Sequence, residues 1–382
     1  MPWRGLWSGR LGAYKAVVIG LGRIASTIDD EVLGTNWMLP FSHAGSYREV
    51  PEVTLAAAAD LHPDQRRDFA ARYELKESQL FEDYRAMITE VKPHIVSVCT
   101  NAKHRHAVVM EIARMRAGVR VIWAEKPISV TLREADEMVA ACREAGIALA
   151  INNLRRWHPW YVQARKLIDD GVLGEIRQVS SYQRGKWSNT SHMVDLARFM
   201  GGGDGRVQWV FGEMESDEAA ASDQDISGVA FWRFASGAHA TLRTVDTGQV
   251  DELDTIGSEG RIRASNNGVG WEFWRKVGEG RTAEFALHQF PRPQWLASPG
   301  AMAVRDFIEV IETGKQPNCT GEDGVAHLDA ILAARESHRR GGVKIELPLA
   351  DRSLGILSSE LKFELPRAVA YRMGVPGALP WH

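Results

Sequence analysis

The sequence is poor in cysteine: its 382 residues include only Cys99, Cys142 and Cys319, which stand far apart. An odd number of widely spaced cysteines predicts neither a disulfide framework nor a zinc cluster. Cys99 lies inside an apolar stretch, where a cysteine behaves as a small core residue. We therefore expect the protein to work in a reducing compartment.

Long apolar runs and an excess of one charge are absent too. No stretch reaches the ~18 consecutive apolar residues that a membrane helix needs. The basic N-terminus is not followed by the apolar segment of a signal peptide. A formal net charge of −3 gives no reason to expect nucleic acid or an acidic membrane as a partner. The expectation is a globular protein of the cytoplasm.

Up to about residue 150, apolar runs alternate regularly with helical patterns. Short apolar runs typical of buried strands occur at 15–20, 53–60, 94–100 and 120–125. The segments between them place apolar residues at helical spacing. Buried strands that alternate with helices predict a doubly wound parallel sheet with helices on both faces.

The pattern changes after about residue 153. Longer strands joined by tight turns are indicated at 175–184, 226–247 and 251–268, and helical patterns flank them. This mixture is typical of an α+β domain. We therefore predict two domains, residues 1–150 with the parallel sheet and residues 151–382 with the α+β fold.

A glycine-rich turn, Gly20-Leu21-Gly22-Arg23-Ile24-Ala25, follows directly after the first apolar run. It fits G-x-G-x-x-A, in which the glycines permit a tight turn and a close approach of the backbone to a pyrophosphate. We expect a helix to begin at this turn and to add positive partial charge there. The motif predicts a dinucleotide site, with contacts from Gly20, Gly22, Arg23 and Ile24.

Asp60 ends the second apolar run, where a carboxylate accepts hydrogen bonds from ribose hydroxyls. Its separation from Gly22 exceeds the usual ~20 residues. We assign the excess to an insertion at 27–41, between the glycine turn and a helix-like segment at 42–50. An acid at this position repels a 2′-phosphate, so NAD is favoured over NADP, although Arg66 stands close by in the sequence.

The third and fourth apolar runs also end in polar residues, Thr100-Asn101 and Glu125-Lys126-Pro127. Ligands of open α/β sheets bind where the carboxyl ends of parallel strands meet. We therefore expect Lys126 to face whatever the glycine turn holds. Pro127 favours an extended backbone at Lys126, which limits where its side chain can point.

With the segments GLGRIA, AAAD, CTNAKH, AEKP, NLRRW and SHMVDLARFMGG, the sequence resembles the Gfo/Idh/MocA family of sugar and cyclitol oxidoreductases. The resemblance covers nearly the whole chain. Its most specific part is E-K-P at a strand end, followed later by H-x-x-D-L. It implies an N-terminal Rossmann domain and a C-terminal α+β domain with a large open, mostly antiparallel sheet. Such sheets are often used to form homodimers or homotetramers.

The resemblance implies that Lys126 contacts the substrate hydroxyl and that His192 exchanges its proton while hydride passes to or from nicotinamide C4. A histidine suits proton exchange near neutral pH, and a nearby ammonium polarises the oxygen. The implied cofactor is NAD. Further cofactor contacts are expected from Thr100, Asn101, His104, Glu125, Lys126 and Asn153.

One position departs from the family pattern. Family members often carry an aspartate four residues before this histidine, and here the position is Ser188, followed by Asn189. A serine cannot supply the negative charge that would tune His192 and Lys126. Asp195 follows His192 by three residues and is a candidate to orient the helix or the imidazole. We therefore do not expect an ordinary Lys–Asp–His relay.

Candidate substrate contacts besides Lys126 and His192 are Arg156, Trp157, Trp187 and Asn189. The alternative for the first two is a salt-bridged surface with an aromatic core anchor. Trp187 is a candidate to stack on a sugar face. His104 and His106 form H-x-H, but without acids or cysteines at ligand spacing they predict no metal site.

Three functions are compatible with these residues. The leading one is an NAD-dependent dehydrogenase that acts on a secondary hydroxyl of a small-molecule sugar, glycoside or cyclitol. The second is an NAD-dependent glycoside hydrolase that oxidises transiently, eliminates the aglycone, adds water and reduces again; the missing aspartate favours it modestly. The third, a non-catalytic sensor, is disfavoured because both Lys126 and His192 are present.

Overall fold

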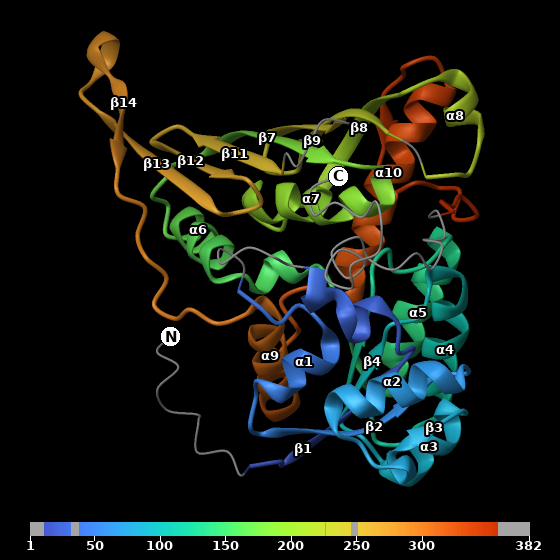
Figure 1. Ribbon diagram of the computed structural model, residues 1–382. Coiled ribbons are helices and arrows are strands. Elements are labelled where there is room, and N and C mark those ends of the chain that lie inside the picture. Colours follow the sequence, from blue (N-terminus) through green and yellow to red (C-terminus); the bar gives the residue numbers. More distant parts are fainter. Residues whose placement is uncertain (1–10, 32–37, 226, 246–250, 358–382) are drawn as a thin grey trace, which may run out of the picture.

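The computed structural model describes residues 11–31, 38–225, 227–245 and 251–357, with only the backbone for residues 184, 187–190 and 245. In this part of the chain the strands form two sheets, one of six strands and one of nine. Figure 1 shows the six-stranded sheet with its helices below and the nine-stranded sheet above. No helix among the described residues is both long and apolar enough to cross a membrane.

The first sheet is parallel and has the strand order β3-β2-β1-β4-β5-β6. Its strands are β1 (Tyr14–Ile19), β2 (Val53–Ala59), β3 (Leu80–Phe81), β4 (Ile95–Val98), β5 (Val121–Ala124) and β6 (Ala148–Ile151). Every residue of β4 and β5 is buried, which explains their continuous apolar runs. This order is that of a Rossmann fold and confirms the predicted doubly wound parallel sheet.

Helices connect these strands. They are α1 (His43–Arg48), α2 (Pro63–Tyr73), α3 (Tyr84–Val91), α4 (Ala102–Met115) and α5 (Leu132–Ala145). The ends of α5 show how the sequence sets such helices. Thr131 and Glu134 form a capping box at its start, and Gly146 ends it with a positive φ of 69°.

The helix that we expected at the glycine turn is not there, and that prediction was wrong. Two 3₁₀ helices, η2 (Arg23–Ala25) and η3 (Thr27–Glu31), follow the turn instead. The inserted segment displaces the α-helix, which begins only at His43 and is capped by Ser42. Asp29 fixes the insertion to this cap by accepting hydrogen bonds from the backbone N–H of Phe41 (2.6 Å) and Ser42 (3.0 Å). Residues 32–37 of the insertion lie outside the described residues.

The second sheet has the order β14-β13-β12-β11-β7-β10-β9-β8-β15 and is antiparallel except for the β7–β10 pair. Its strands are β7 (Ile176–Arg184), β8 (Val207–Met214), β9 (Gly228–Phe234), β10 (His239–Val245), β11 (Glu252–Gly257), β12 (Gly260–Ser265), β13 (Gly270–Val277), β14 (Glu284–His288) and β15 (Ile345–Glu346). This confirms the expected large, open and mostly antiparallel sheet.

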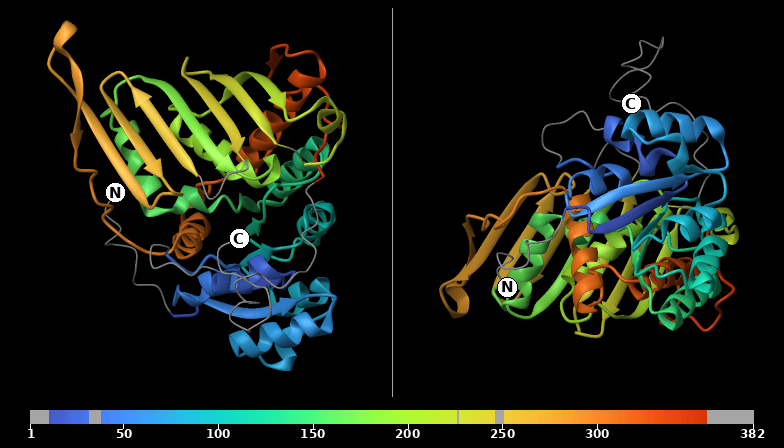
Figure 2. Two further views of the ribbon diagram at one scale, coloured as in Figure 1. Left: turned by 45° about the horizontal axis from the view of Figure 1, so that its top comes forward. Right: turned by 90° about the horizontal axis from the view of Figure 1, so that it is seen from below.

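Helices cover one face of the second sheet. They are α6 (Pro159–Asp169), α7 (Trp187–Met200) and α10 (Gly321–Arg339), while the short α8 (Asp217–Ala221) lies at one end. Figure 2 shows these helices gathered on the side that faces the first sheet. The sheet is therefore open on its other face over the described residues.

The chain crosses back between the two sheets after the second one is complete. The helix α9 (Pro299–Thr313) packs against α1 and β5 of the first sheet. Its Phe307 ring lies 5.3 Å from that of Trp123 and 5.9 Å from that of Trp157. Residues from the C-terminal half thus complete the core beside the first sheet, and the division near residue 150 stays a prediction.

Candidate active site

One row of paired residues crosses the first sheet at the carboxyl ends of its strands. Ala59, Ile19, Val98, Ala124 and Ile151 are successive partners along it. The chain carries Thr100, Lys126 and Asn153 two residues after this row, just past the ends of β4, β5 and β6. The register therefore brings together at one edge the residues that the sequence placed at separate strand ends.

The glycine turn begins at this edge. Gly20 has a φ of +84°, and a Cβ on it would lie 3.1 Å from the backbone nitrogen of Thr100. A side chain is thus excluded for two reasons. A Cβ on Gly22, by contrast, would meet no atom within 4 Å. The turn therefore packs closely against β4 and leaves open space on the side where a pyrophosphate would lie.

Asp60 ties the end of β2 to the glycine turn. Its Oδ2 accepts a hydrogen bond from the Leu21 N–H (2.8 Å), and its Oδ1 accepts one from the His62 N–H (2.9 Å). Each carboxylate oxygen keeps a second lone pair for a ribose hydroxyl. The Arg66 guanidinium donates to the Asp60 carbonyl at 2.6 Å, so a cation also lies at this end.

Arg23 and Ile24 follow the glycines on η2. The Arg23 guanidinium is about half exposed and forms a bidentate pair with Glu31 (2.5 and 2.6 Å). Ile24 is half-buried. Both residues lie at the turn as expected, and their contacts to a cofactor stay a prediction.

The end of β4 supplies three predicted cofactor residues with different surroundings. The Thr100 hydroxyl oxygen is buried and has no hydrogen-bond partner within the described structure. Asn101 is exposed and caps α4 by accepting from the Lys103 N–H (3.0 Å). His104 is exposed on the first turn of α4. Of the three, Thr100 offers a buried polar atom to a ligand.

Arg105, which we did not single out from the sequence, holds two strand ends together. Its side chain comes from α4, is 2% exposed, and donates to the carbonyls of Thr100 (2.5 Å) and Pro127. Burial lowers the pKa of this guanidinium to about 10. A cation on the apolar face of a helix, beside Val108 and Val109, was the available signal.

Glu125 belongs to a buried polar network beneath the edge. His43 Nε2 lies 3.1 Å from Glu125 Oε1, and His43 Nδ1 lies 2.8 Å from the Ser97 hydroxyl. The Asn152 amide also donates to Glu125 Oε1. Burial would raise the pKa of Glu125, but the bonds from His43 and Asn152 outweigh it and lower that pKa. The carboxylate is thus held ionised inside the protein.

Lys126 follows at the end of β5 and is joined to Pro127 by a cis peptide bond. Burial is the main cause that lowers the pKa of Lys126, to about 8. The cations of Arg155 and Arg23 add to the effect, whereas Glu125 and Asp225 oppose it. This ammonium can therefore exchange a proton close to neutral pH.

His192 lies on the second turn of α7. Burial holds its pKa well below the usual value, and the nearby charges of Lys126 and Arg155 lower it further. Its Nδ1 is buried without a hydrogen-bond partner among the residues described. The charge of Lys126 thus acts on a neutral imidazole, and a shared contact of the two side chains with one substrate hydroxyl stays a prediction.

Comparison with known proteins agrees with this geometry. Residues 14–153 match the family model (GFO_IDH_MocA) described as an oxidoreductase family with an NAD-binding Rossmann fold. The myo-inositol 2-dehydrogenase of Thermotoga maritima is 24% identical over 352 residues, which cover 86% of this chain and 98% of that enzyme. Within residues 14–153 the chain is thus similar to the Gfo/Idh/MocA family of oxidoreductases.

Solved structures share the fold of this chain. An aldose-aldose oxidoreductase from Caulobacter crescentus, complexed with glycerol, has a TM-score of 0.71 at 21% identity, covering 87% of this chain and 99% of the other. A levoglucosan dehydrogenase in complex with NADH has a TM-score of 0.69 at 17% identity, covering 88% and 99%. At these identities the likeness shows the fold alone.

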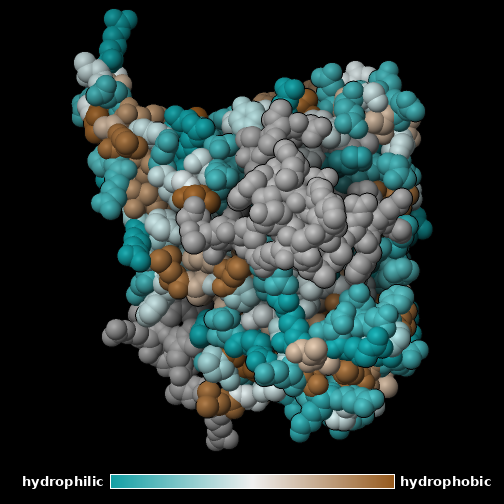
Figure 3. Space-filling view, viewed as in Figure 1, coloured by the Kyte–Doolittle hydropathy of each residue, from teal (hydrophilic) through white to brown (hydrophobic). Residues whose placement is uncertain are grey.

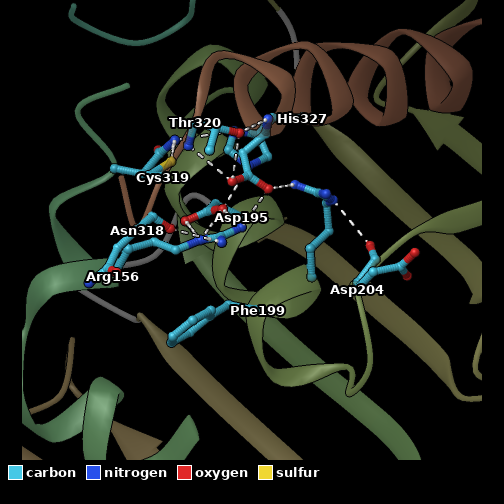
Figure 4. A network of polar contacts seen from close by, with 12 residues as sticks. Arg156, Asp195, Phe199, Asp204, Asn318, Cys319, Thr320 and His327 are labelled. Atoms are coloured by element: carbon cyan, nitrogen blue, oxygen red, sulfur yellow. Dashed lines mark hydrogen bonds and ion pairs between the residues drawn. The ribbon is translucent and has the colours of Figure 1, made fainter. Parts of the chain in front are cut away.

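Two of the predicted substrate residues lie in the interior of the protein. Arg156 is 9% exposed, and its guanidinium contacts the carboxylates of Asp195 (2.6 Å) and Asp323 (3.1 Å) (Figure 4). Trp157 is 1% exposed and donates to Asp306 at 2.8 Å. Trp157 matches the core anchor of the alternative interpretation, whereas the salt bridges of Arg156 lie in the interior and not at the surface. A substrate role for either residue stays a prediction that no contact supports.

The described contacts of Asp195 also go elsewhere than to His192. Besides Arg156, its carboxylate lies 2.6 Å from Nε2 of His327 on α10. The side chains of Trp187, Ser188 and Asn189 fall outside the described residues, so their predicted roles are untested. Sequence reasoning missed His327 and His43, because a single histidine in an apolar segment does not reveal its distant partners.

The site fits a dinucleotide. The glycine turn is open beside Gly22, and Asp60 stands at the ribose end. Thr100 follows the end of β4 and Asn153 follows the end of β6, on either side of β5, which leads to Lys126. Each carries a buried oxygen without a partner in the described structure, Thr100 Oγ1 and Asn153 Oδ1. A buried polar atom is normally hydrogen-bonded, so these oxygens could receive polar groups of a dinucleotide.

Proposed function

We propose that this chain is an NAD-dependent dehydrogenase that moves hydride between nicotinamide and a secondary hydroxyl of a sugar, glycoside or cyclitol. The observation that carries the proposal is electrostatic. Besides burial, the charge of Lys126 lowers the pKa of His192, and the charge of Arg23 on the glycine turn lowers the pKa of Lys126. The relatives named above act, by their names, on an inositol and on sugars, which supports this substrate class.

The two side chains divide the work on the hydroxyl. Oxidation of a carbinol carbon requires loss of the hydroxyl proton together with hydride. His192 is neutral, and its buried Nδ1 lone pair can take that proton. The Lys126 ammonium can donate a hydrogen bond to the same oxygen and stabilise the negative charge that develops on it. Bound NAD supplies the hydride acceptor.

We propose NAD rather than NADP as the cofactor. The Asp60 carboxylate faces the ribose end and would repel a 2′-phosphate, while the solved levoglucosan dehydrogenase holds NADH. Arg66 donates to the backbone of Asp60 and lies 4.0 Å from Glu82, which engages its charge. Calorimetric titration should show tighter binding of NAD, and tighter binding of NADP would overturn this assignment.

A panel of sugars, cyclitols and aryl glycosides tests the reaction. With NAD present, we expect NADH absorbance to rise for at least one member, without stoichiometric release of the aglycone. Aglycone release without net NADH would instead support the glycoside hydrolase, which gains no specific support from the relatives and is not proposed. Lys126→Ala is the matched control, because it should abolish the signal while the protein still binds NAD.

We also propose that the chain works as a homodimer or homotetramer in the cytoplasm. The open face of the second sheet exposes Tyr182, Phe211 and Phe231, which are 48%, 36% and 37% exposed. Figure 3 shows further apolar side chains at the projecting β13–β14 hairpin, where Phe285 and Leu287 are 41% and 67% exposed. Gathered apolar side chains of this kind are typical of protein interfaces.

A further inference from the structure

Asn153 is fully buried, and only the nitrogen of its side-chain amide has partners among the described residues. It stands two residues past Ile151, whose partner on the neighbouring strand is Ala124, and Lys126 stands two residues past Ala124. The Asn153 amide nitrogen lies 3.1 Å from His327 Nδ1 and 3.6 Å from the Cys319 sulfur. Its carbonyl oxygen is buried and accepts no hydrogen bond from any described residue.

The partner of His327 decides which way this amide faces. His327 Nε2 lies 2.6 Å from Asp195 Oδ1 (Figure 4). Burial would raise the pKa of Asp195, but the charges of Arg156 and His327 outweigh it and lower that pKa. Burial lowers the pKa of His327, so this imidazole is neutral. The ionised carboxylate beside Nε2 favours the tautomer that carries its one proton on that nitrogen.

A neutral imidazole protonated on Nε2 has only a lone pair on Nδ1. That lone pair can accept a hydrogen bond from the NH₂ of Asn153, whereas it would repel the carbonyl oxygen. The Asp195–His327 pair thus fixes one orientation of the Asn153 amide, with the carbonyl oxygen left for another donor.

We propose that Asp195 and His327 are positioning residues that hold Asn153 ready to accept a hydrogen bond from the carboxamide N–H of a bound nicotinamide. The inference rests on the proposed function, because it takes NAD as the ligand. Asn153 follows the end of β6 and Thr100 follows the end of β4, on either side of β5, which leads to Lys126, and each carries a buried oxygen without a described partner. A carboxamide anchored there would fix the rotation of the nicotinamide ring beside Lys126.

The 3-acetylpyridine analogue of NAD isolates this hydrogen bond, because its acetyl group keeps the carbonyl and lacks the N–H. Calorimetric titration of the wild type should show NAD binding about tenfold more tightly than the analogue, the scale of one buried hydrogen bond. This measurement needs no variant. Equal affinity for the two dinucleotides would overturn the proposal.

Two variants of His327 separate positioning from packing. His327→Leu should bind NAD about tenfold more weakly and the analogue almost unchanged, so that the preference disappears. His327→Gln can donate to Asp195 and accept from Asn153, and it should keep most of the preference. A His327→Leu protein that retains the full preference would contradict the role assigned to His327.

The outcomes also separate this inference from the function on which it rests. A wild type that binds no NAD would overturn both. A wild type that binds NAD and oxidises a sugar, but does not discriminate against the analogue, would overturn only the role of Asn153 and His327. Thermal unfolding of each variant shows whether a lost preference comes from the site or from a protein that no longer folds.

Discussion

Burial and like charge act on Lys126 and His192 in the same direction, since both favour the uncharged form of each side chain. Lys126 is left with a pKa of about 8, and His192 with a pKa well below its usual value. A neutral imidazole and an ammonium with a lowered pKa can together pass a proton to and from an oxygen without an intervening carboxylate. This pairing is a physical alternative to the aspartate that Ser188 replaces.

Substitution of these two residues should separate binding from chemistry. Lys126→Ala should remove turnover and leave the NAD dissociation constant nearly unchanged, because the proposed contact is to the reacting oxygen. His192→Ala should lower kcat by about 10²–10⁴-fold, the scale of a positioned acid–base group. Steady-state rates and calorimetry with NAD check both results. Unchanged rates in both variants would show that this edge is not catalytic.

The pKa of Lys126 also predicts a pH dependence. The ammonium is present below about pH 8 and is lost above it, so kcat/KM should fall as the pH rises through about 8. In Lys126→Arg the guanidinium stays charged, and whatever activity remains should lack this basic limb. A pH–rate profile of the two proteins measures the difference. A wild-type profile that stays flat from pH 7 to pH 9 would count against the ammonium.

At the scale of elements, a few buried side chains fasten the strand ends that form the site. Arg105 joins the ends of β4 and β5 from α4, and His43 at the start of α1 supports Glu125 at the end of β5. The aromatic ring of His43 also lies 3.7 Å from that of Trp123. The insertion matters here, because it moves the start of α1 to His43 itself.

Removal of His43 should therefore cost stability. His43→Ala deprives the ionised Glu125 of a buried partner, so the free energy of unfolding should fall by about 1.5–3 kcal/mol at pH 7. Because the pKa of Glu125 is lowered in the folded protein, its stabilising contribution is present above its unfolded pKa of ~4.3 and is lost as the pH falls through the folded pKa. The effect of the substitution should shrink in that acidic range.

A matched control for this prediction is His106→Ala. His106 lies 2.8 Å from Glu137, but both side chains are partly exposed, at 26% and 48%. Exposed pairs contribute about 0–1 kcal/mol, so denaturant unfolding should barely distinguish this variant from the wild type. Equal losses for the His43 and His106 variants would contradict the stabilising role of the buried network.

At the scale of the whole molecule, the second sheet shows one face to the helices and leaves the other open. On β8 and β9 the Trp209 ring lies 5.5 Å from that of Phe211 and 5.7 Å from that of Phe231. The Phe231 ring also stacks on His239 at 5.3 Å. A single chain gains little by ordering so many rings at its surface. A second copy of the chain against this face would bury them.

The proposed assembly predicts the effect of a charge on that face. Phe231→Glu should shift the protein toward the monomer, because it would bury a carboxylate in the contact. Leu11→Glu is the control, since Leu11 is 82% exposed and precedes β1 of the first sheet. Sedimentation at micromolar concentration distinguishes the species. A monomeric wild type would overturn the assembly.

The sequence by itself determined the parallel sheet, its carboxyl edge and the presence of Lys126 there. Strands buried on both faces require continuous apolar runs, and the ends of parallel strands must meet, so local patterns sufficed for these features. The resemblance to the Gfo/Idh/MocA family, which implied the second sheet, followed from motifs that are equally local.

Only the tertiary structure decided the partners of the buried polar groups. Arg156 could be read as a ligand contact or as a salt bridge, and its burial beside Asp195 and Asp323 supports the salt bridge. His43 meets Glu125, and Asn153 meets His327, across long separations in the chain. A polar side chain in an apolar segment must find a partner, but which partner it finds depends on how distant segments pack.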